Sequence, residues 1–193
     1  MKHLLSNCEN FLHVDYIRRH NKALQCILFP FLHSNDFIDT CPPWYTPITI
    51  KPRYENEDII MLWDIPEYVG GEEEDETKIF RPDGKIILKK DKKVILLEMS
   101  VPWIENREAK LEEKINKYKG VIRNLKLEYQ GFKVDQATFI IDVLGGYSKH
   151  LKSNIAKIGY SSETIEKLQL KLQKIVLTEA RNIINKFKVS TSE

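Results

Sequence analysis

The run from Lys93 to Val101 carries apolar side chains on both faces of a strand. A strand of this kind belongs in the middle of a sheet, where both of its faces are covered. A second β-rich run, Lys85 to Lys89, precedes it, and only Lys90-Asp91-Lys92 separates the two. Two such runs joined by so short a connector predict an antiparallel hairpin.

A long amphipathic helix is predicted to follow the hairpin, from Asn106 to about Gln130. Its apolar residues recur at alternating steps of four and three, which places them on one side of a helix. They are Leu111, Ile115, Tyr118, Ile122, Leu125 and Tyr129. The helix is expected to pack this side against the sheet.

The other segments complete an α/β pattern. Helices are predicted over 14–33, 149–157 and 162–188, strands over 59–65 and 137–144, and a proline-rich connector over 39–52. This order is typical of an α/β domain with a small mixed central sheet flanked by helices.

Charge is segregated along the chain, although the net charge is only +2. Residues 55–76 are acidic and end in the run 72–76, which we expect to form an exposed hairpin loop. Basic residues gather at 85–93 and at 110–126. Clustered lysine suits a polyanion such as DNA, and the nucleic-acid contacts expected here are Lys85, Lys89, Lys90 and Lys110. Charge runs are also common on plain solvated surfaces.

The sequence offers no sign of a membrane or secreted protein. Its apolar runs are shorter than the roughly 18 residues that a membrane helix needs. His3, Cys8 and Glu9 interrupt any apolar signal-peptide core. Three cysteines at irregular spacing predict no disulfide framework. We therefore expect an intracellular protein with no membrane partner.

Two carboxylates, Asp83 and Glu98, belong to the predicted hairpin. Glu98 lies inside the apolar strand, where a charge is costly unless a metal or a lysine pairs with it. Neighbouring antiparallel strands bring side chains on one face within about 5 Å of each other. Two carboxylates so placed can share a hard cation such as Mg²⁺ or Mn²⁺. Metal-assisted phosphodiester hydrolysis uses such an arrangement.

A lysine beside the carboxylates would complete a nuclease site. Ser100 occupies the strand position, two residues after Glu98, where that lysine would stand. The predicted helix offers a substitute, because Lys110, Lys114 and Lys117 recur at steps of four and three along the edge of its apolar side. A lysine there can extend toward the sheet while its stem stays covered.

Each of these residues also has a purely structural interpretation. Arg-Pro-Asp-Gly at 81–84 is an ordinary turn sequence. Glu98 can pair with a core lysine, and Lys117 can form a surface pair with Glu113. Residue chemistry alone leaves both interpretations open.

Several of these segments strongly resemble the restriction-enzyme-like endonuclease domain of site-specific non-LTR retrotransposons. They are Arg81-Pro82-Asp83, Leu97 to Trp103, Asn106 to Glu108 and Glu113 to Tyr118. Ile140 to Gly146 also resembles the strand that follows the helix in that family. The resemblance covers roughly residues 3–187 and is most specific over 81–118.

The resemblance implies a PD-(D/E)XK nuclease fold in which the catalytic lysine has moved from the strand to the next helix. It implies that Asp83 and Glu98 bind Mg²⁺ or Mn²⁺ and that the Lys-x-x-Lys-Tyr element at 114–118 supplies the lysine. We expect Lys114 in that role, because Lys117 is farther from the start of the helix, and we expect Tyr118 to pack or bond beneath. DNA is the implied partner, the RNA of the parent element is a further one, and a nuclear location is implied.

The N-terminus resembles the end of the Cys-Cys-His-Cys zinc knuckle that precedes this nuclease domain. His3 and Cys8 match its last half, and Arg19-His20 match the Arg-His that follows and that would contact nucleic acid. Two of four ligands should not hold zinc, which suggests a reading frame that starts inside the knuckle. We expect one domain overall, composed of a knuckle remnant at 1–13, a helix and connector at 14–52, and a nuclease-like core with C-terminal helices at 53–193. The reverse transcriptase of the parent is not expected in this chain.

Two non-catalytic interpretations stay open. The chain can be a decayed retrotransposon remnant that keeps its fold and basic surface, and so acts at most as a nucleic-acid-binding module. It can also be a helical interaction module built on the apolar side of the final helix, 162–188.

Overall fold

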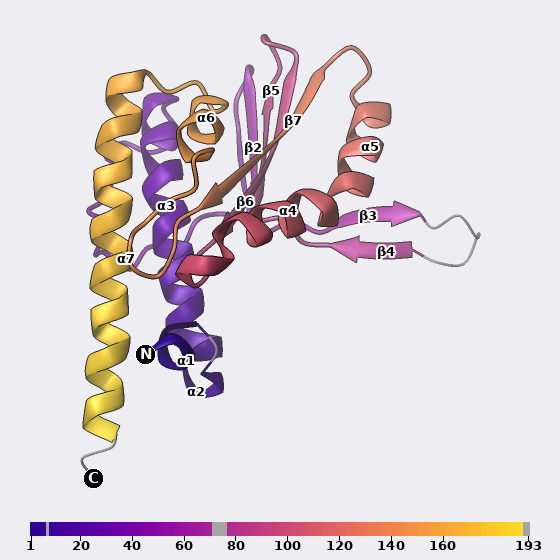
Figure 1. Cartoon of the computed structure of the whole chain (residues 1–193). Helices are drawn as coiled ribbons and strands as arrows, with labels where there is room; N and C mark the ends of the chain where they lie inside the picture. Colours follow the sequence, from indigo (N-terminus) through magenta and orange to yellow (C-terminus); the bar gives the residue numbers. More distant parts are fainter. Residues whose placement is uncertain (7, 71–76, 191–193) are drawn as a thin grey trace. The chain divides into compact units, whose positions relative to one another are not determined.

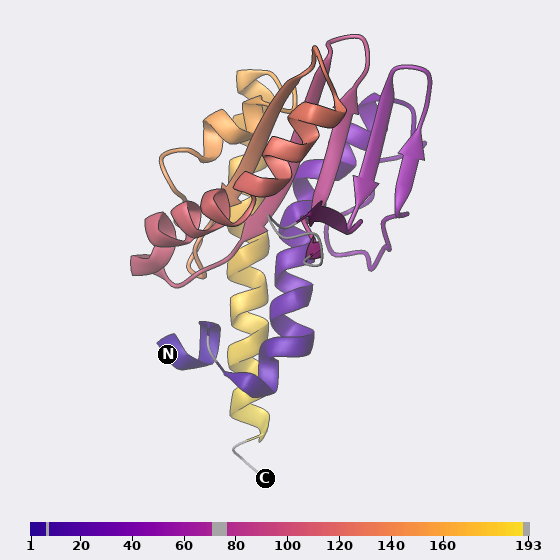
Figure 2. The ribbon, with the colours of Figure 1, turned by 90° about the vertical axis from the view of Figure 1, so that its right-hand side faces the viewer.

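The computed structural model describes residues 1–6, 8–70 and 77–190 (Figures 1 and 2). The chain forms two compact units that are interleaved in sequence. The helical unit consists of Met1–Pro47, Met99–Lys110 and Phe139–Glu193, and the sheet unit consists of Ile48–Glu98 and Leu111–Thr138. Each unit is described by itself.

A five-stranded sheet with the order β1-β2-β5-β6-β7 runs through the sheet unit. Its strands are β1 (Arg53–Glu55), β2 (Ile59–Trp63), β5 (Gly84–Leu88), β6 (Lys93–Ser100) and β7 (Lys133–Ile140). The last residues of β6 and β7 belong to the helical unit. The pairs β1–β2, β2–β5 and β5–β6 are antiparallel, so the predicted hairpin is confirmed.

Strand β7 runs parallel to β6, which makes the sheet mixed. The Lys133 N–H donates to the Lys92 carbonyl at 2.7 Å, and the Ile141 N–H donates to the Ser100 carbonyl at 3.3 Å. Residue numbers therefore rise in the same direction along both strands. A parallel pair needs a crossover connection, and helices α4 (Arg107–Lys117) and α5 (Lys119–Glu128) provide it. The expected α/β class with a small mixed sheet is confirmed.

The single helix predicted over 106–130 is interrupted at Tyr118, which corrects the sequence-based boundary. Tyr118 has φ −99° and ψ 8°, outside the helical range, and its side chain is completely buried. One apolar stripe therefore does not continue through both helices. Ile115, which the periodicity placed on that stripe, is 42% exposed.

Helix α5 packs on the β5–β6 part of the sheet through a hydrophobic cluster. The buried members of this cluster include Ile87, Val94, Leu96, Tyr118, Val121, Leu125 and Val134. Every residue of β6 from Val94 to Ser100 is buried, as the apolar character of both its faces predicts. The same cluster includes Val69 of β3 (Glu67–Gly70).

Strands β3 and β4 (Thr77–Phe80) form a separate two-stranded antiparallel sheet. The expected acidic loop at 72–76 connects them in sequence and lies outside the described residues. Neither β3 nor β4 was predicted, nor was β1. All three are short, and none contains a continuous aliphatic run like Ile86-Ile87-Leu88 of β5.

The helical unit contains α1 (Lys2–Ser6), α2 (Glu9–Phe11), α3 (Ile17–Ser34), α6 (Leu151–Ala156) and α7 (Ser162–Ser190). A wide π-type turn at Leu12–Tyr16 leads into α3, and a 3-10 turn at Ile104–Asn106 leads into α4. The predicted helices at 14–33, 149–157 and 162–188 are thus confirmed, with shifted ends. The connector over 39–52 contains no helix or strand.

Helices α3 and α7 lie side by side (Figures 1 and 2). The apolar side of α7 contributes Leu168, Leu172, Ile175, Val176 and Ile183 to the core, all at most 4% exposed. Phe187, near its end, is 43% exposed. Most of the apolar face that suggested an interaction module is therefore already covered within the unit. No helix among the described residues is both long and apolar enough to cross a membrane.

Candidate active site

Asp83 directly precedes β5 and Glu98 lies in β6, and continuing their register by one residue sets the two opposite each other. Gly84 of β5 pairs with Leu97 of β6, so the residue before Gly84 faces the residue after Leu97. Directly opposed side chains of an antiparallel pair point to the same face of the sheet. The Asp83 carbonyl also accepts a hydrogen bond of 3.2 Å from the Asp64 N–H, which ties this turn to the end of β2. The two carboxylates therefore share one face of the sheet.

Glu98 is held in a place that disfavours its charge. It is 2% exposed. Burial, and then repulsion by Asp83, raises the pKa of the Glu98 carboxyl above its ordinary value, whereas Lys114 and Tyr118 act in the opposite direction. A raised pKa from burial beside a second carboxylate is a common property of functional sites.

The two oxygens of the Glu98 carboxylate have different surroundings. Oε1 accepts a short ion-pair contact from the Lys114 ammonium group. Oε2 is buried and has no hydrogen-bond partner among the described residues. A buried charged oxygen without a partner loses its hydration without compensation. The carboxylate is therefore only half satisfied by the protein groups that surround it.

Lys114 reaches Glu98 from the last turn of α4. Its side chain is 16% exposed. The backbone of this turn is fixed to β7, because the Gln136 side-chain amide donates to the Lys114 carbonyl at 3.1 Å and to the Thr138 hydroxyl at 3.0 Å. Lys117 lies one turn further, with its ammonium group 4.8 Å from the centre of the Tyr118 ring. Of the two lysines in the predicted element, the structure brings Lys114 to the carboxylate.

Tyr118 connects the helix break to the turn that carries Asp83. Its hydroxyl donates a 2.9 Å hydrogen bond to the Arg81 carbonyl. Burial and then the nearby Glu98 and Asp83 carboxylates raise the pKa of this phenol strongly, so it stays protonated. The hydroxyl also lies close enough to Glu98 to lower the pKa of that carboxyl. Tyr118 thus joins the break between α4 and α5 to the turn before β5.

The lysines expected to contact nucleic acid in the hairpin have protein partners. Lys85 is 6% exposed and forms a 2.5 Å ion pair with Glu67. Its burial and this ion pair do not suit a phosphate contact at the surface. Lys89 pairs with Glu55 at 3.3 Å, and Lys90 pairs with Asp58 at 2.6 Å. Lys110, in the helical unit, is half-buried.

The N-terminal candidates lie in the helical unit and are largely covered. Arg19 is 2% exposed and stacks over Tyr16 at 5.1 Å, so it is not placed to meet a nucleic acid. His20 is half-buried, with Nε2 at 3.2 Å from the Met99 carbonyl oxygen. His3 and Cys8 line one apolar cavity of about 570 Å³.

The donor set at the sheet suits a hard cation with few protein ligands. Among the described residues no cluster brings together three or more His, Cys, Asp or Glu side chains. Asp83 and Glu98 supply two carboxylates, and the partnerless Oε2 of Glu98 provides an acceptor with nothing else to bind. Mg²⁺ commonly takes one or two carboxylates and completes its shell with water and substrate phosphate oxygens. The residues present therefore fit Mg²⁺ or Mn²⁺.

Sequence reasoning missed two features that shape this site. Gln136, a polar residue inside β7, fixes the turn that carries Lys114. A cavity between α4–α5 and β7 is lined by Lys119, Arg123 and Lys126. The sequence placed these cations in the basic series 110–126, but a charge pattern alone could not show that they line a cavity against β7.

No protein-family model matches the chain, and no curated protein matches it either. The chemistry of the site is therefore judged on its geometry.

Proposed function

We propose that the chain is a metal-dependent DNA endonuclease that nicks its target, with its centre at Asp83, Glu98 and Lys114. The observation that carries the proposal is the state of Glu98: it is buried, faces Asp83, contacts Lys114, and leaves one oxygen without a partner. A carboxylate kept in this state costs stability. A function for it explains why the cost is tolerated.

The acidic and basic residues of the site would have different roles. Asp83 and Glu98 would hold Mg²⁺ or Mn²⁺, which when bound supplies stabilisation of phosphate charge and an activated water. Lys114 would exchange its contact with Glu98 for a phosphate oxygen, because a cation beside the developing negative charge lowers the barrier. Tyr118 is a positioning residue that holds the Arg81–Asp83 turn against the helix.

The sequence resemblance over 81–118 supports the same assignment and extends it. It favours the PD-(D/E)XK variant of the α/β fold, an origin in a retrotransposon, a nuclear location and a nucleic-acid partner. The inactive remnant is the alternative, with the same fold and no chemistry.

The proposal is tested by nicking of supercoiled plasmid DNA with Mg²⁺, with Mn²⁺ and with a chelator. The wild-type protein should nick only with a metal present. Asp83→Asn, Glu98→Gln and Lys114→Ala should each reduce the rate at least on the order of a hundredfold, the usual effect of losing an acid–base or charge-stabilising group. All three should still bind DNA.

Two matched variants serve as controls. Asp91→Asn removes an exposed carboxylate from the β5–β6 turn, and Lys117→Ala removes the lysine one turn beyond Lys114. Both should retain most of the activity. Nicking that survives Lys114→Ala and is lost with Lys117→Ala would show that Lys117, and not Lys114, is the functional lysine. No nicking by the wild-type protein with either metal would favour the inactive remnant.

A further inference from the structure

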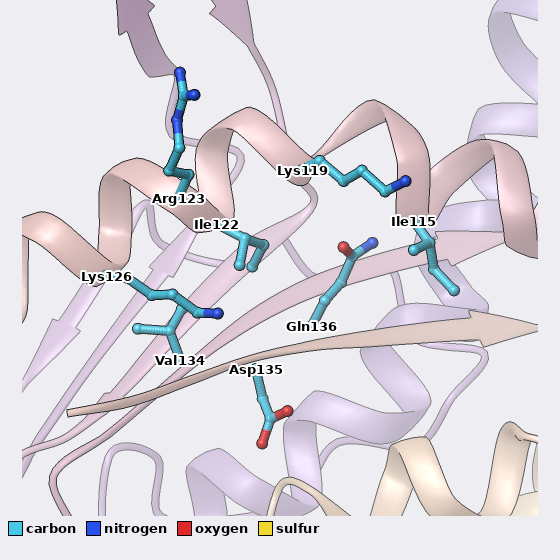
Figure 3. A pocket seen from close by; sticks show the side chains of 8 residues that line it. All are labelled: Ile115, Lys119, Ile122, Arg123, Lys126, Val134, Asp135 and Gln136. Atoms are coloured by element: carbon cyan, nitrogen blue, oxygen red, sulfur yellow. The ribbon is translucent and has the colours of Figure 1, made fainter.

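A basic cavity lies between α4–α5 and strand β7, within the sheet unit. It has a volume of about 460 Å³ and is bounded on the helix side by Lys119, Arg123 and Lys126. Figure 3 shows Lys119 and Lys126 on the helix wall, with Gln136 and Val134 on the strand opposite them. Strand β7 is the last strand in the sheet order. The cavity therefore lies along the edge of the sheet.

The positive charge of this cavity is not neutralised by the residues around it. Lys119, Arg123 and Lys126 are exposed, and within 1–6, 8–70 and 77–190 no ion pair is found for any of them. The one carboxylate in the lining, Asp135, has its own partner, Lys133, at 3.4 Å. An exposed cation cluster without counter-charges attracts polyanions.

The three cations occupy neighbouring turns of α5, and Figure 3 shows the Arg123 side chain directed away from strand β7. They occupy successive turns of α5, so that Lys119 and Arg123 are about 6 Å apart along the axis, and Arg123 and Lys126 about 4.5 Å, at the helical rise of 1.5 Å per residue. The wall also contains apolar side chains, with Ile115 42% exposed and Ile122 half-buried. A row of cations beside apolar surface suits a chain of phosphates whose sugars and bases are also accessible.

The cavity begins next to the proposed site. Ile115 follows Lys114 in the chain, and Gln136, part of the cavity lining, donates to the Lys114 carbonyl at 3.1 Å. A strand held here would pass close to the turn of helix that contacts Glu98. This proximity links the cavity to the candidate active site without involving the hairpin lysines, which have protein partners.

We propose that the cavity between α5 and β7 binds the phosphodiester backbone of a single DNA strand. Its volume is that of a small-ligand pocket, so one strand fits the space and a whole duplex does not. Lys119 and Lys126 contact phosphates within the cavity, Arg123 contacts a phosphate at its rim, and Ile115 and Ile122 contact the sugars and bases. The inference rests on the proposed nucleic-acid partner, and it does not require the chain to cut DNA.

The test is fluorescence anisotropy with a labelled single-stranded DNA oligonucleotide, titrated at several salt concentrations without metal. The variant Lys119→Ala/Arg123→Ala/Lys126→Ala should weaken binding on the order of tenfold at about 50 mM salt. The slope of log affinity against log salt should fall by about 2, because each lost phosphate contact of a single strand contributes about 0.7. Alanine favours helix, so α5 should remain folded, which circular dichroism checks.

The matched control is Lys167→Ala/Lys174→Ala/Arg181→Ala on α7. It removes two exposed lysines and one exposed arginine from another helix, so the change in net charge is the same. DNA binding by this variant should change little. Equal losses in the two triple variants would overturn the proposal, because net charge alone would then explain them. Displacement of the oligonucleotide by polyglutamate of equal charge at the same concentration would overturn it as well.

The two proposals fail in different ways. If the cavity variant loses strand binding while the wild-type protein nicks nothing, the cavity binds single-stranded DNA and the nuclease proposal fails. If Glu98→Gln abolishes nicking while the cavity variant binds as the wild-type protein does, the active site stands and the cavity assignment is wrong.

Discussion

At the residue scale the molecule is organised around one carboxylate in an unfavourable place. Glu98 could be recognised from the sequence, because a charge within an apolar strand needs a partner. Its opposition to Asp83 also follows from the hairpin pattern, since register fixes which side chains share a face. The choice between Lys114 and Lys117 depended on helix direction, and the structure brings Lys114 to Glu98. The half-satisfied state of the carboxylate could not be predicted, because it depends on which groups the fold places around each of its two oxygens.

Removing the charge of Glu98 should stabilise the folded protein at neutral pH. The Glu98 pKa is raised on folding above its ordinary value of 4.5, so its contribution to stability is fully present below pH 4.5 and is lost as pH rises through the folded-state pKa. Glu98→Gln should therefore have the higher melting temperature at pH 7, and the difference should vanish near pH 4. Thermal unfolding followed by circular dichroism across this range provides the measurement.

Lys114→Ala is the opposite change in the same pair. It leaves the buried carboxylate without its counter-charge, which costs about 3 kcal/mol in buried pairs, so its melting temperature should be lower than that of the wild-type protein. If Glu98→Gln is instead the less stable variant at pH 7, the carboxylate is a structural partner of Lys114, and the functional interpretation loses its main support.

At the element scale the sequence predicted types better than boundaries. Periodicity located the long helices and the β5–β6 hairpin because their apolar patterns are continuous. It missed the break at Tyr118, because the spacing of apolar residues there is that of a continuous helix, and the break follows from the burial of Tyr118 and its bond to Arg81. The observed ends of α3 and α7 differ from the predicted ends for a similar reason. The local apolar pattern does not determine where tertiary packing of a helix stops.

Helices α3 and α7 are joined by a buried ion-pair cluster whose stability depends on pH. Glu179 of α7 is fully buried and accepts contacts of 2.7 Å from Arg18 and 2.8 Å from Lys22 of α3. Burial raises its pKa, but the two cations outweigh burial, and the net shift is downward from 4.5. Its stabilising contribution is therefore present above pH 4.5 and is lost as pH falls through the lower folded-state value.

Glu179→Gln should destabilise the protein by about 3 kcal/mol at neutral pH, the typical cost of breaking a buried ion pair. The deficit relative to the wild-type protein should shrink as pH falls below 4.5, and it should vanish once pH is below the lowered folded-state pKa, where both proteins carry a neutral side chain. Urea unfolding at a series of pH values measures it. Glu166→Gln is the matched control, because the Glu166 side chain is 69% exposed, and it should leave stability unchanged. A pH-independent deficit would show that the side chain acts through packing alone.

At the scale of the whole molecule, the chain order and the compact units do not coincide. The sequence suggested consecutive parts, whereas the helical unit takes residues from three separate stretches and the sheet unit from two. Composition and local pattern cannot reveal this interleaving, because it arises from contacts between distant segments. The candidate active site is nevertheless local to the sheet unit, since Asp83, Glu98 and Lys114 all belong to it. The residues that compose it lie in one hairpin and in the helix that follows.

The central claim is that Glu98 is kept for a metal and that its ion pair with Lys114 is secondary. Electron paramagnetic resonance of Mn²⁺ added to the protein without DNA tests this directly, because free and bound Mn²⁺ give different signals. The wild-type protein should bind Mn²⁺, Asp83→Asn and Glu98→Gln should lose that binding, and Lys114→Ala should bind as tightly or more tightly, because the competing cation is gone. Equal Mn²⁺ binding by the wild-type protein and Glu98→Gln, or loss of binding in Lys114→Ala alone, would contradict the claim.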